Sequence, residues 1–292
     1  MNVFVTGGTR GVGRAIVEGI ASHAGKDAAH IIYLGCRDKA VGAALAAQVG
    51  SPAGVSAHVS IVPIVIDVTK RTSVAEAAAQ LAADCASIGR PLDALVNNAG
   101  VLLERVDRTL SEIIEPTMCV NFDGVCAVTD AILPLLRKGG QVINVSSGAG
   151  TRASSALDAA TRAELDGASV PALRAAVVRL AEEAAELPRQ TGETPVYALS
   201  KMALNFYTIR LAREAAHIRV NACSPGFCRT EIAGQDVVYT RQPKDARLGA
   251  DVVLKMLFSE LGATSTGCFF KECSAPGTPL HEARSAEEPW NA

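Results

Sequence analysis

The feature that most constrains the fold is a regular alternation of short apolar runs with longer helical stretches. Runs such as NVFV, HIIYLGC, SIVPIVIDV and LDALVN have the length and the Val, Ile and Leu content of buried strands. Helices are expected over residues 11–22, 38–49 and 71–87, and a further one ends near Leu136. The later runs QVINVSS, IRVNACSPG and GCFFKEC continue the pattern. The sequence therefore predicts an α/β fold with a Rossmann-type, doubly wound parallel sheet.

One long segment, at about residues 150–193, interrupts this alternation before TPVYALSK. Ser169 and Pro171 are typical of a helix start. The stretch that follows places apolar residues on one helical stripe, which comprises Val170, Leu173, Val177, Leu180, Ala184 and Leu187. We predict a single domain over residues 1–273 with this helical insertion, followed by a loosely packed tail over 274–292 that is rich in Pro, Glu and Ser.

Charge and composition narrow the class of ligand. With 28 basic and 30 acidic residues, the net charge of −2 offers no field for nucleic acid or an anionic membrane. The chain begins MNVFVTGG, unlike a secretion signal, and Asp130 and Pro134 interrupt its apolar run VCAVTDAILPLL. The 8 cysteines and 5 histidines show no metal-ligand spacing. We expect a cytoplasmic protein with reduced thiols, no metal and a small-molecule ligand.

The first predicted strand runs directly into the glycine-rich stretch TGGTRGVG. Gly7, Gly11 and Gly13 would let the backbone turn tightly and approach a pyrophosphate at the N-terminus of the next helix. A simple strand-to-helix turn is the alternative interpretation. Because the stretch follows a strand, opens a helix and begins a βαβ unit, it favours a dinucleotide site.

Two arginines indicate which dinucleotide binds. Arg10 lies within the glycine-rich stretch and Arg37 ends the second strand, so two guanidinium groups could flank a 2′-phosphate. We therefore expect NADPH/NADP+. Asp38 is evidence for the opposite preference, because an acid just past this strand could bind a ribose hydroxyl instead.

The stretch TPVYALSKMALNFY places Tyr197 and Lys201 at positions i and i+4 of a predicted helix. Residues at this spacing are neighbours on one helix face. Two ordinary solvated side chains are the alternative interpretation of the pair.

The motifs TGGTRGVG, NNAG, NVSS and YALSK occur in this order, and over nearly its whole length the chain resembles the short-chain dehydrogenase/reductase family. LGCRDKAVG, the long insertion and NACSPGFCRTEIAG resemble its NADPH-dependent carbonyl reductase branch. In that branch the insertion covers a helix face that most members of the wider family use to form dimers or tetramers. The resemblance is therefore compatible with a monomer.

The resemblance implies roles for individual residues. Asn121 would hold a water and support the lysine, Ser147 would bind the substrate oxygen, Tyr197 would donate the proton and Lys201 would complete the catalytic set, with Ser146 a structural hydroxyl. The implied cofactor-binding residues are Gly7, Arg10, Gly11, Val12, Gly13 and Arg37; Asp67 and Val68 at the adenine; Asn97, Ala99 and Gly100 beside the adenosine ribose; Pro225, Gly226 and Thr230 at the nicotinamide carboxamide; and Tyr197 and Lys201.

The implied chemistry explains the Tyr–Lys pair. Hydride delivery to a carbonyl carbon builds negative charge on the oxygen, which needs a proton or hydrogen bonds as it forms. A free tyrosine has a pKa near ~10, and a cation within ~4–6 Å lowers such an acid by ~1–3 units. We expect Lys201 to act in this way on Tyr197 and to hydrogen-bond the nicotinamide ribose. The predicted activity is the NADPH-dependent reduction of a ketone, aldehyde or quinone to an alcohol.

The sequence does not set the substrate. GAGTRASS, after Ser147, contains small and polar residues plus Arg152, and Phe227 is either an aromatic pocket wall or a core residue. The loop over residues 229–243, which includes Tyr239, is expected to cover the site. A dedicated pterin or steroid reductase and a non-catalytic NADPH-binding redox sensor remain alternatives. Reduction of a carbon–carbon double bond is disfavoured, because family members with that activity space their Tyr and Lys more widely.

Overall fold

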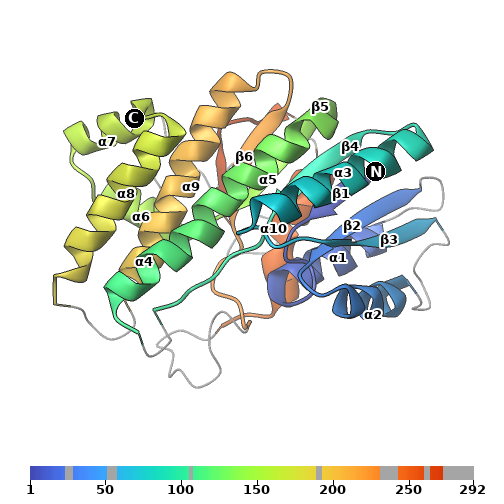
Figure 1. The fold of residues 1–292 in the computed structure, drawn as a ribbon, viewed down its shortest axis with the longest axis horizontal. Coiled ribbons are helices and arrows are strands. Elements are labelled where there is room, and N and C mark those ends of the chain that lie inside the picture. The colour runs from blue at the N-terminus through green and yellow to red at the C-terminus, as the bar shows by residue number, and fades with distance from the viewer. Residues whose placement is uncertain are drawn as a thin grey trace.

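Parallel strands form the centre of the computed structural model (Figure 1), which describes residues 1–23, 29–50, 58–104, 108–188, 193–230, 243–259 and 264–271. Within these residues one 7-stranded sheet has the order β3-β2-β1-β4-β5-β6-β7, and every neighbouring pair is parallel. The strands are β1 Asn2–Val5, β2 His30–Cys36, β3 Val59–Val65, β4 Leu92–Asn97, β5 Leu136–Val145, β6 Arg219–Ser224 and β7 Phe269–Lys271. The predicted doubly wound parallel sheet is confirmed.

Helices cover both faces of this sheet (Figure 1). Helices α1 Gly11–His23, α2 Lys39–Gly50 and α10 Ala246–Phe258 share one apolar core with Val3 and Val5 of β1. Helices α3 Arg71–Ile88, α5 Gly124–Ile132 and α9 Pro195–Glu214 share the other core with Phe4. Successive strand residues point to opposite faces, so a continuous apolar run supplies both cores at once.

The stretch Leu110–Leu135 is helical throughout but not uniform. It comprises α4 Leu110–Met118, the π-helical turn η1 Cys119–Asp123, α5, and the 3-10 turn η2 Leu133–Leu135. Thr109 and Glu112 form a capping box at its start. Among the described helices, this stretch is long and apolar enough to cross a membrane by length and composition, but half of its most apolar 18-residue window is buried inside the protein. Met118 and Phe122 contribute to the core beneath the sheet.

The insertion before Tyr197 folds as three helices, α6 Gly148–Ser155, α7 Ala159–Gly167 and α8 Val170–Ala185. As predicted, Ser169 caps α8 by accepting from the N–H of Ala172. Leu173 and Val177 are buried, but Leu187 lies past the end of the helix and is 66% exposed, so the predicted stripe is wrong there.

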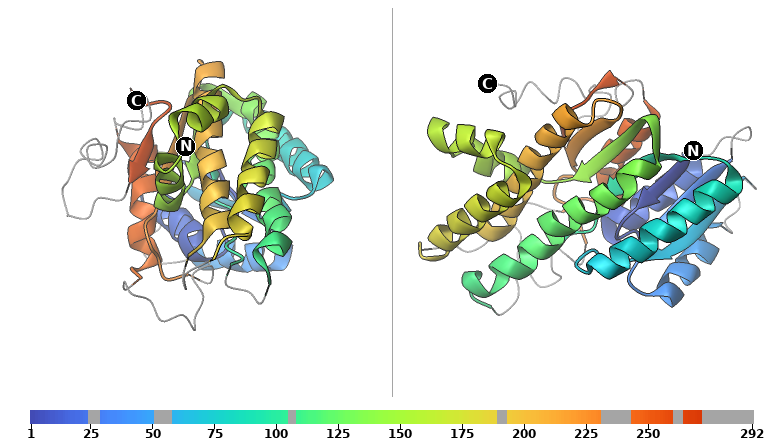
Figure 2. Two further views of the ribbon diagram at one scale, coloured as in Figure 1. Left: turned by 90° about the vertical axis from the view of Figure 1, so that its left-hand side faces the viewer. Right: turned by 45° about the horizontal axis from the view of Figure 1, so that its top comes forward.

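Helix α8 lies beside α4 and α9 (Figures 1 and 2). On the α4 side, the guanidinium of Arg174 contacts Asp123 at 2.9 Å and Glu115 at 2.7 Å. The insertion therefore covers one side of α4 and α9. The monomeric state remains a prediction. The predicted tail over residues 274–292 lies outside the described residues.

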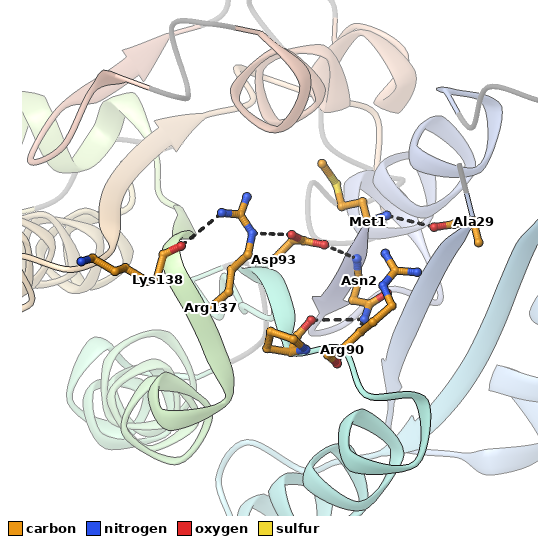
Figure 3. Close-up of polar contacts among 8 residues, drawn as sticks. Met1, Asn2, Ala29, Arg90, Asp93, Arg137 and Lys138 are labelled. Atoms are coloured by element: carbon orange, nitrogen blue, oxygen red, sulfur yellow. Dashed lines mark hydrogen bonds and ion pairs between the residues drawn. The ribbon is translucent and has the colours of Figure 1, made fainter. Parts of the chain in front are cut away.

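The amino ends of the central strands are joined by a polar network (Figure 3). The carboxylate of Asp93, near the start of β4, accepts from the backbone N–H of Asn2 at 2.7 Å and from Nε of Arg137 at 2.5 Å. This network ties β1, β4 and β5 together at one edge of the sheet. The opposite, carboxyl edge is left for the loops that form the site.

Candidate active site

A cavity of about 930 Å³ opens at the carboxyl edge of the sheet, beside the ends of β1, β2, β4, β5 and β6. Its volume is typical of a site for an organic ligand, and doubly wound proteins bind ligands at this edge. Most residues predicted for the cofactor or the chemistry line it: Gly7, Arg10, Gly11, Val12, Gly13, Arg37, Asp67, Val68, Ala99, Gly100, Ser147, Tyr197, Lys201, Pro225, Gly226, Phe227 and Thr230.

The glycine-rich stretch needs its glycines for shape. Gly7 and Gly11 have φ angles of 62° and 53°, a region that favours glycine. A Cβ on Gly13 would clash with the carbonyl oxygen of Gly7. The Nδ2 of Asn98 donates to the carbonyl oxygens of Thr6 and Gly7, both at 3.0 Å. The turn is therefore held at the N-terminus of α1 in a form that suits a phosphate.

Near the end of β2, the basic side chains line the cavity but the acidic one does not. The exposed side chains of Arg10 and Arg37 both line the cavity. Asp38 does not line it, and one of its carboxylate oxygens accepts from the N–H groups of Ala40 at 2.7 Å and Val41 at 3.1 Å. The acid that would favour a ribose hydroxyl instead caps the start of α2.

Two further cofactor-side predictions have different outcomes. Asp67 lines the cavity, and hydrogen bonds from Thr69 hold the pKa of its carboxyl below the usual value. Asn97 does not line the cavity, because its buried Nδ2 donates to Thr129 and Asn144, each at 2.9 Å. Its neighbour Asn98, which follows the strand end, lines the cavity instead.

Tyr197, Lys201 and Ser147 meet at one wall of the cavity. Tyr197 and Lys201 project from α9, and the Nζ of Lys201 lies 5.8 Å from the centroid of the Tyr197 ring. Ser147 follows β5 and caps α6, where its Oγ accepts from the N–H of Ala149 at 3.1 Å. The same hydroxyl hydrogen-bonds Tyr197, so a carbonyl oxygen that enters between the two side chains would meet both hydroxyl groups.

Burial dominates the proton affinities of this group. It raises the pKa of Tyr197, while a hydrogen bond with Ser147 acts to lower it and Glu104 raises it further. Burial also lowers the pKa of Lys201 to about 8. The expectation that the phenol is more acidic than a free tyrosine is not met in this structure, because burial has the largest effect on its pKa. The Nζ of Lys201 donates to the carbonyl oxygen of Val145 at 2.9 Å. A phenol with a raised pKa is protonated at neutral pH, as a proton donor must be.

Asn121 supports the site from behind the cavity wall. It lies in the π-helical turn, and its Nδ2 donates to the oxygens of Val101 and Ser200 at 2.9 and 3.0 Å. A Cβ on Gly100 would lie 3.3 Å from the Oδ1 of Asn121 and 3.4 Å from the Nζ of Lys201. The amide is therefore close to the lysine, but its role in holding a water remains a prediction.

Ser146 has a different environment from Ser147. Its buried hydroxyl donates to the Oδ1 of Asn205 on α9 at 2.6 Å. This contact fixes the end of β5 against the catalytic helix, as expected for a structural hydroxyl.

Sequence reasoning missed two residues that shape the site. The buried carboxylate of Glu104 accepts from the backbone N–H of Tyr197 at 2.6 Å. The hydroxyl of Ser224 accepts from the N–H groups of Gly148 and Gly226 at 3.1 and 3.3 Å. Neither belongs to a recognisable spacing. The position of Ser224 between a strand and a Pro-Gly turn was the only available signal.

The substrate side of the cavity combines apolar and cationic side chains. Phe227 is half-buried and lines the cavity, as expected of a pocket wall, and Arg152 lines it too. Among the described residues no group of three or more His, Cys, Asp or Glu side chains could hold a metal ion. Tyr239 lies outside the described part of the chain.

Comparison with known proteins gives a family match. The family model for short chain dehydrogenases matches residues 1–163. The chain is 32% identical over 165 residues to carbonyl reductase [NADPH] 1 of Oryctolagus cuniculus, an alignment that covers 53% of this chain and 59% of the rabbit protein. It is also 27% identical to salutaridine reductase of Papaver somniferum, over 92% of this chain and 93% of the poppy protein.

Solved structures agree in fold. The structure of salutaridine reductase from Papaver somniferum superposes with a TM-score of 0.73 at 23% identity, covering 93% of this chain and 99% of that one. A short chain dehydrogenase from Burkholderia cenocepacia J2315 in complex with NADP has a TM-score of 0.65 at 21% identity, covering 92% and 94%. At these identities the likeness shows the fold.

Proposed function

The chain belongs to the short-chain dehydrogenase family, and from this premise we propose that it reduces a ketone, aldehyde or quinone to an alcohol with NADPH. The observation that carries the proposal is the meeting of Tyr197, Ser147 and Lys201 at one wall of a cavity whose other end is the glycine-rich turn. A binding protein has no need for a proton donor at this place. The carbonyl reductase named among the relatives supports the same activity.

The residues of the cavity fit a dinucleotide. The turn at Gly7 and Gly11 would hold the pyrophosphate, and Asp67 and Val68, which line the same cavity, would contact the adenine. Arg10 and Arg37 would bind the 2′-phosphate, and the engagement of Asp38 in capping α2 removes the main argument for NADH. When bound, NADPH would supply the hydride.

The chain's own residues would then stabilise the reacting oxygen. Ser147 donates its O–H to the carbonyl oxygen, which polarises the carbonyl and stabilises the developing charge. Tyr197 donates the proton to the same oxygen. Lys201, charged below about pH 8, keeps a positive potential beside the phenol as the proton leaves it. Asn121 and Glu104 fix the loop after β4 and the start of α9, so the donors stay in position.

A dedicated metabolic reductase is the second candidate. The likeness to salutaridine reductase extends over nearly the whole of both chains, and that protein's name specifies one substrate. The same catalytic residues would serve a pterin or a steroid, so only the pocket distinguishes these possibilities.

The direct test mixes the purified protein with NADPH and a panel of quinones, α-dicarbonyls and aromatic aldehydes, and follows the loss of cofactor absorbance. We expect turnover of some members, reduced by about 100-fold or more in Tyr197→Phe, with NADPH binding retained. Tight NADPH binding without turnover of any panel member would contradict the broad reductase and favour a specialised substrate or the redox-sensor alternative.

A further inference from the structure

One cation on the substrate side of the cavity is left without a use by the proposed reaction. Arg152 lies on α6, which begins directly after Ser147, and its exposed side chain lines the cavity. The Nη1 of its guanidinium lies 3.5 Å from the position that a Cβ on Gly148 would take. The side chain therefore folds back along the helix toward its N-terminus. Its guanidinium lies beside Gly148, the residue that follows Ser147 in the chain.

Among the residues that the structure describes, none provides a counter-charge for Arg152. Within the described chain, no hydrogen bond or ion pair joins its guanidinium to another residue. Lys244 and Lys271 line the same cavity. Asp67 is the one acidic residue among the described residues that line the cavity. It is expected at the adenosine side of the site, and its carboxylate contacts Thr69 and Lys70. The cavity thus attracts an anion, which an arginine binds with two parallel hydrogen bonds.

We propose that the carbonyl substrate carries a carboxylate that binds Arg152 while its carbonyl oxygen binds Ser147 and Tyr197. This inference rests on the proposed function and specifies its substrate class as an oxo acid. The guanidinium lies beside Gly148, which follows Ser147 in the chain. The carboxylate and the carbonyl of the substrate are therefore close enough to belong to one small molecule. The half-buried ring of Phe227 in the same cavity suits an apolar or aromatic body between them.

The test compares each acid with its neutral ester. The pairs are 4-carboxybenzaldehyde with methyl 4-formylbenzoate, and phenylglyoxylate with methyl phenylglyoxylate, which place the carboxylate at two separations from the carbonyl. Arg152→Leu should lower kcat/KM for the preferred acid about tenfold, which corresponds to the loss of one charged contact, and leave that of its ester within twofold. Arg152→Lys should retain part of the acid preference.

The matched control is Arg179→Leu, which removes a guanidinium that is 58% exposed on α8 and pairs with Glu164 away from the cavity. It should leave both substrates unaffected. If wild type and Arg152→Leu treat acid and ester alike, the inference is wrong although the reductase activity stands.

A second readout does not depend on turnover. Calorimetric titration of the NADP+-saturated protein with benzoate should show binding that weakens about tenfold in Arg152→Leu and not in Arg179→Leu. Such binding without reduction of any aldehyde would support the anion site and contradict the proposed function. Equal benzoate affinity in wild type and Arg152→Leu would overturn the anion site.

Discussion

At the scale of single residues, the alternation at the end of β5 decides which serine can act. Successive side chains of an extended strand point to opposite sides, so Ser146 donates to Asn205 within the protein while Ser147 opens α6 at the cavity. The Oγ of Ser147 accepts from the N–H of Ala149, and the same hydroxyl hydrogen-bonds Tyr197 at the cavity. A shift of one residue would bury the donor.

The pKa values at the site predict a pH profile for carbonyl reduction. The lowered pKa of Lys201, about 8, means that its ammonium is charged below this pH and neutral above it, while the raised pKa of Tyr197 keeps the phenol protonated. We expect kcat to be level on the acid side and to fall as pH rises through about 8. Steady-state rates at saturating NADPH, with protein stability followed at each pH, check this. A rate that rises through the same range would contradict it.

Cofactor choice is also decided by single residues. Arg37→Asp replaces a cation that lines the cavity with an anion, which repels a 2′-phosphate. The KM for NADPH should rise at least tenfold more than the KM for NADH. A tenfold difference corresponds to about 1.4 kcal/mol of binding free energy. Steady-state kinetics with each cofactor measure both values. Equal changes for the two cofactors would show that Arg37 does not read the phosphate.

At the scale of elements, the packing of α6 on α9 sets the distance between Ser147 and the Tyr–Lys pair. The two helices touch at Gly150, where a Cβ would lie 2.6 Å from the backbone carbon of Lys201 and 2.8 Å from its oxygen. Backbone atoms cannot move aside as a flexible side chain can. The close approach therefore requires glycine at this position.

Gly150→Ala should push α6 away from α9. We expect a loss of about 1–3 kcal/mol in the free energy of unfolding, typical of overpacking, together with a lower kcat. Gly167→Ala in α7 is the matched control, since nothing lies within 4 Å of its Cβ position, and it should keep full activity. Urea unfolding and turnover test both variants. Unchanged activity in Gly150→Ala would show that the spacing is not critical.

Elements and motif residues were predictable from the sequence because each depends on local pattern. Apolar runs gave the strands, and Ser169 marked the start of α8. Features that depend on tertiary contact were not predictable: Asn97 turns to Thr129 and Asn144, Asn121 lies in a π-helical turn, and Glu104 reaches Tyr197 across 93 residues. The direction of the Tyr197 pKa shift was misjudged because burial cannot be read from a spacing of four residues.

At the scale of the whole molecule, the sheet separates stability from chemistry. The Asp93 network joins the amino ends of β1, β4 and β5, whereas the cavity lies at their carboxyl ends. Each carboxylate oxygen of Asp93 accepts from one N–H donor. In Asp93→Asn an NH₂ group, which cannot accept, replaces one of these oxygens, so one hydrogen bond to a charged group is lost.

We expect Asp93→Asn to lower the free energy of unfolding by about 1.5–3 kcal/mol and to leave kcat and the KM values unchanged. Asp251→Asn, at an exposed position on α10, serves as the control and should change neither. Denaturant titration and steady-state kinetics make the comparison. A changed kcat in folded Asp93→Asn would show that the two edges of the sheet are coupled.

Isotope labelling follows the proposed transfer of a hydride from NADPH to a carbonyl carbon in the cavity. The protein would be incubated with NADPH that carries deuterium at both C4 positions of the nicotinamide and with the best aldehyde or α-dicarbonyl of the panel, whose alcohol product retains the transferred hydrogen on carbon. The alcohol would be analysed by mass spectrometry and NMR. We expect one deuterium on the carbinol carbon, and a much slower formation of this product by Tyr197→Phe. Cofactor oxidation that yields an alcohol without deuterium, or no oxidation with any carbonyl, would contradict it.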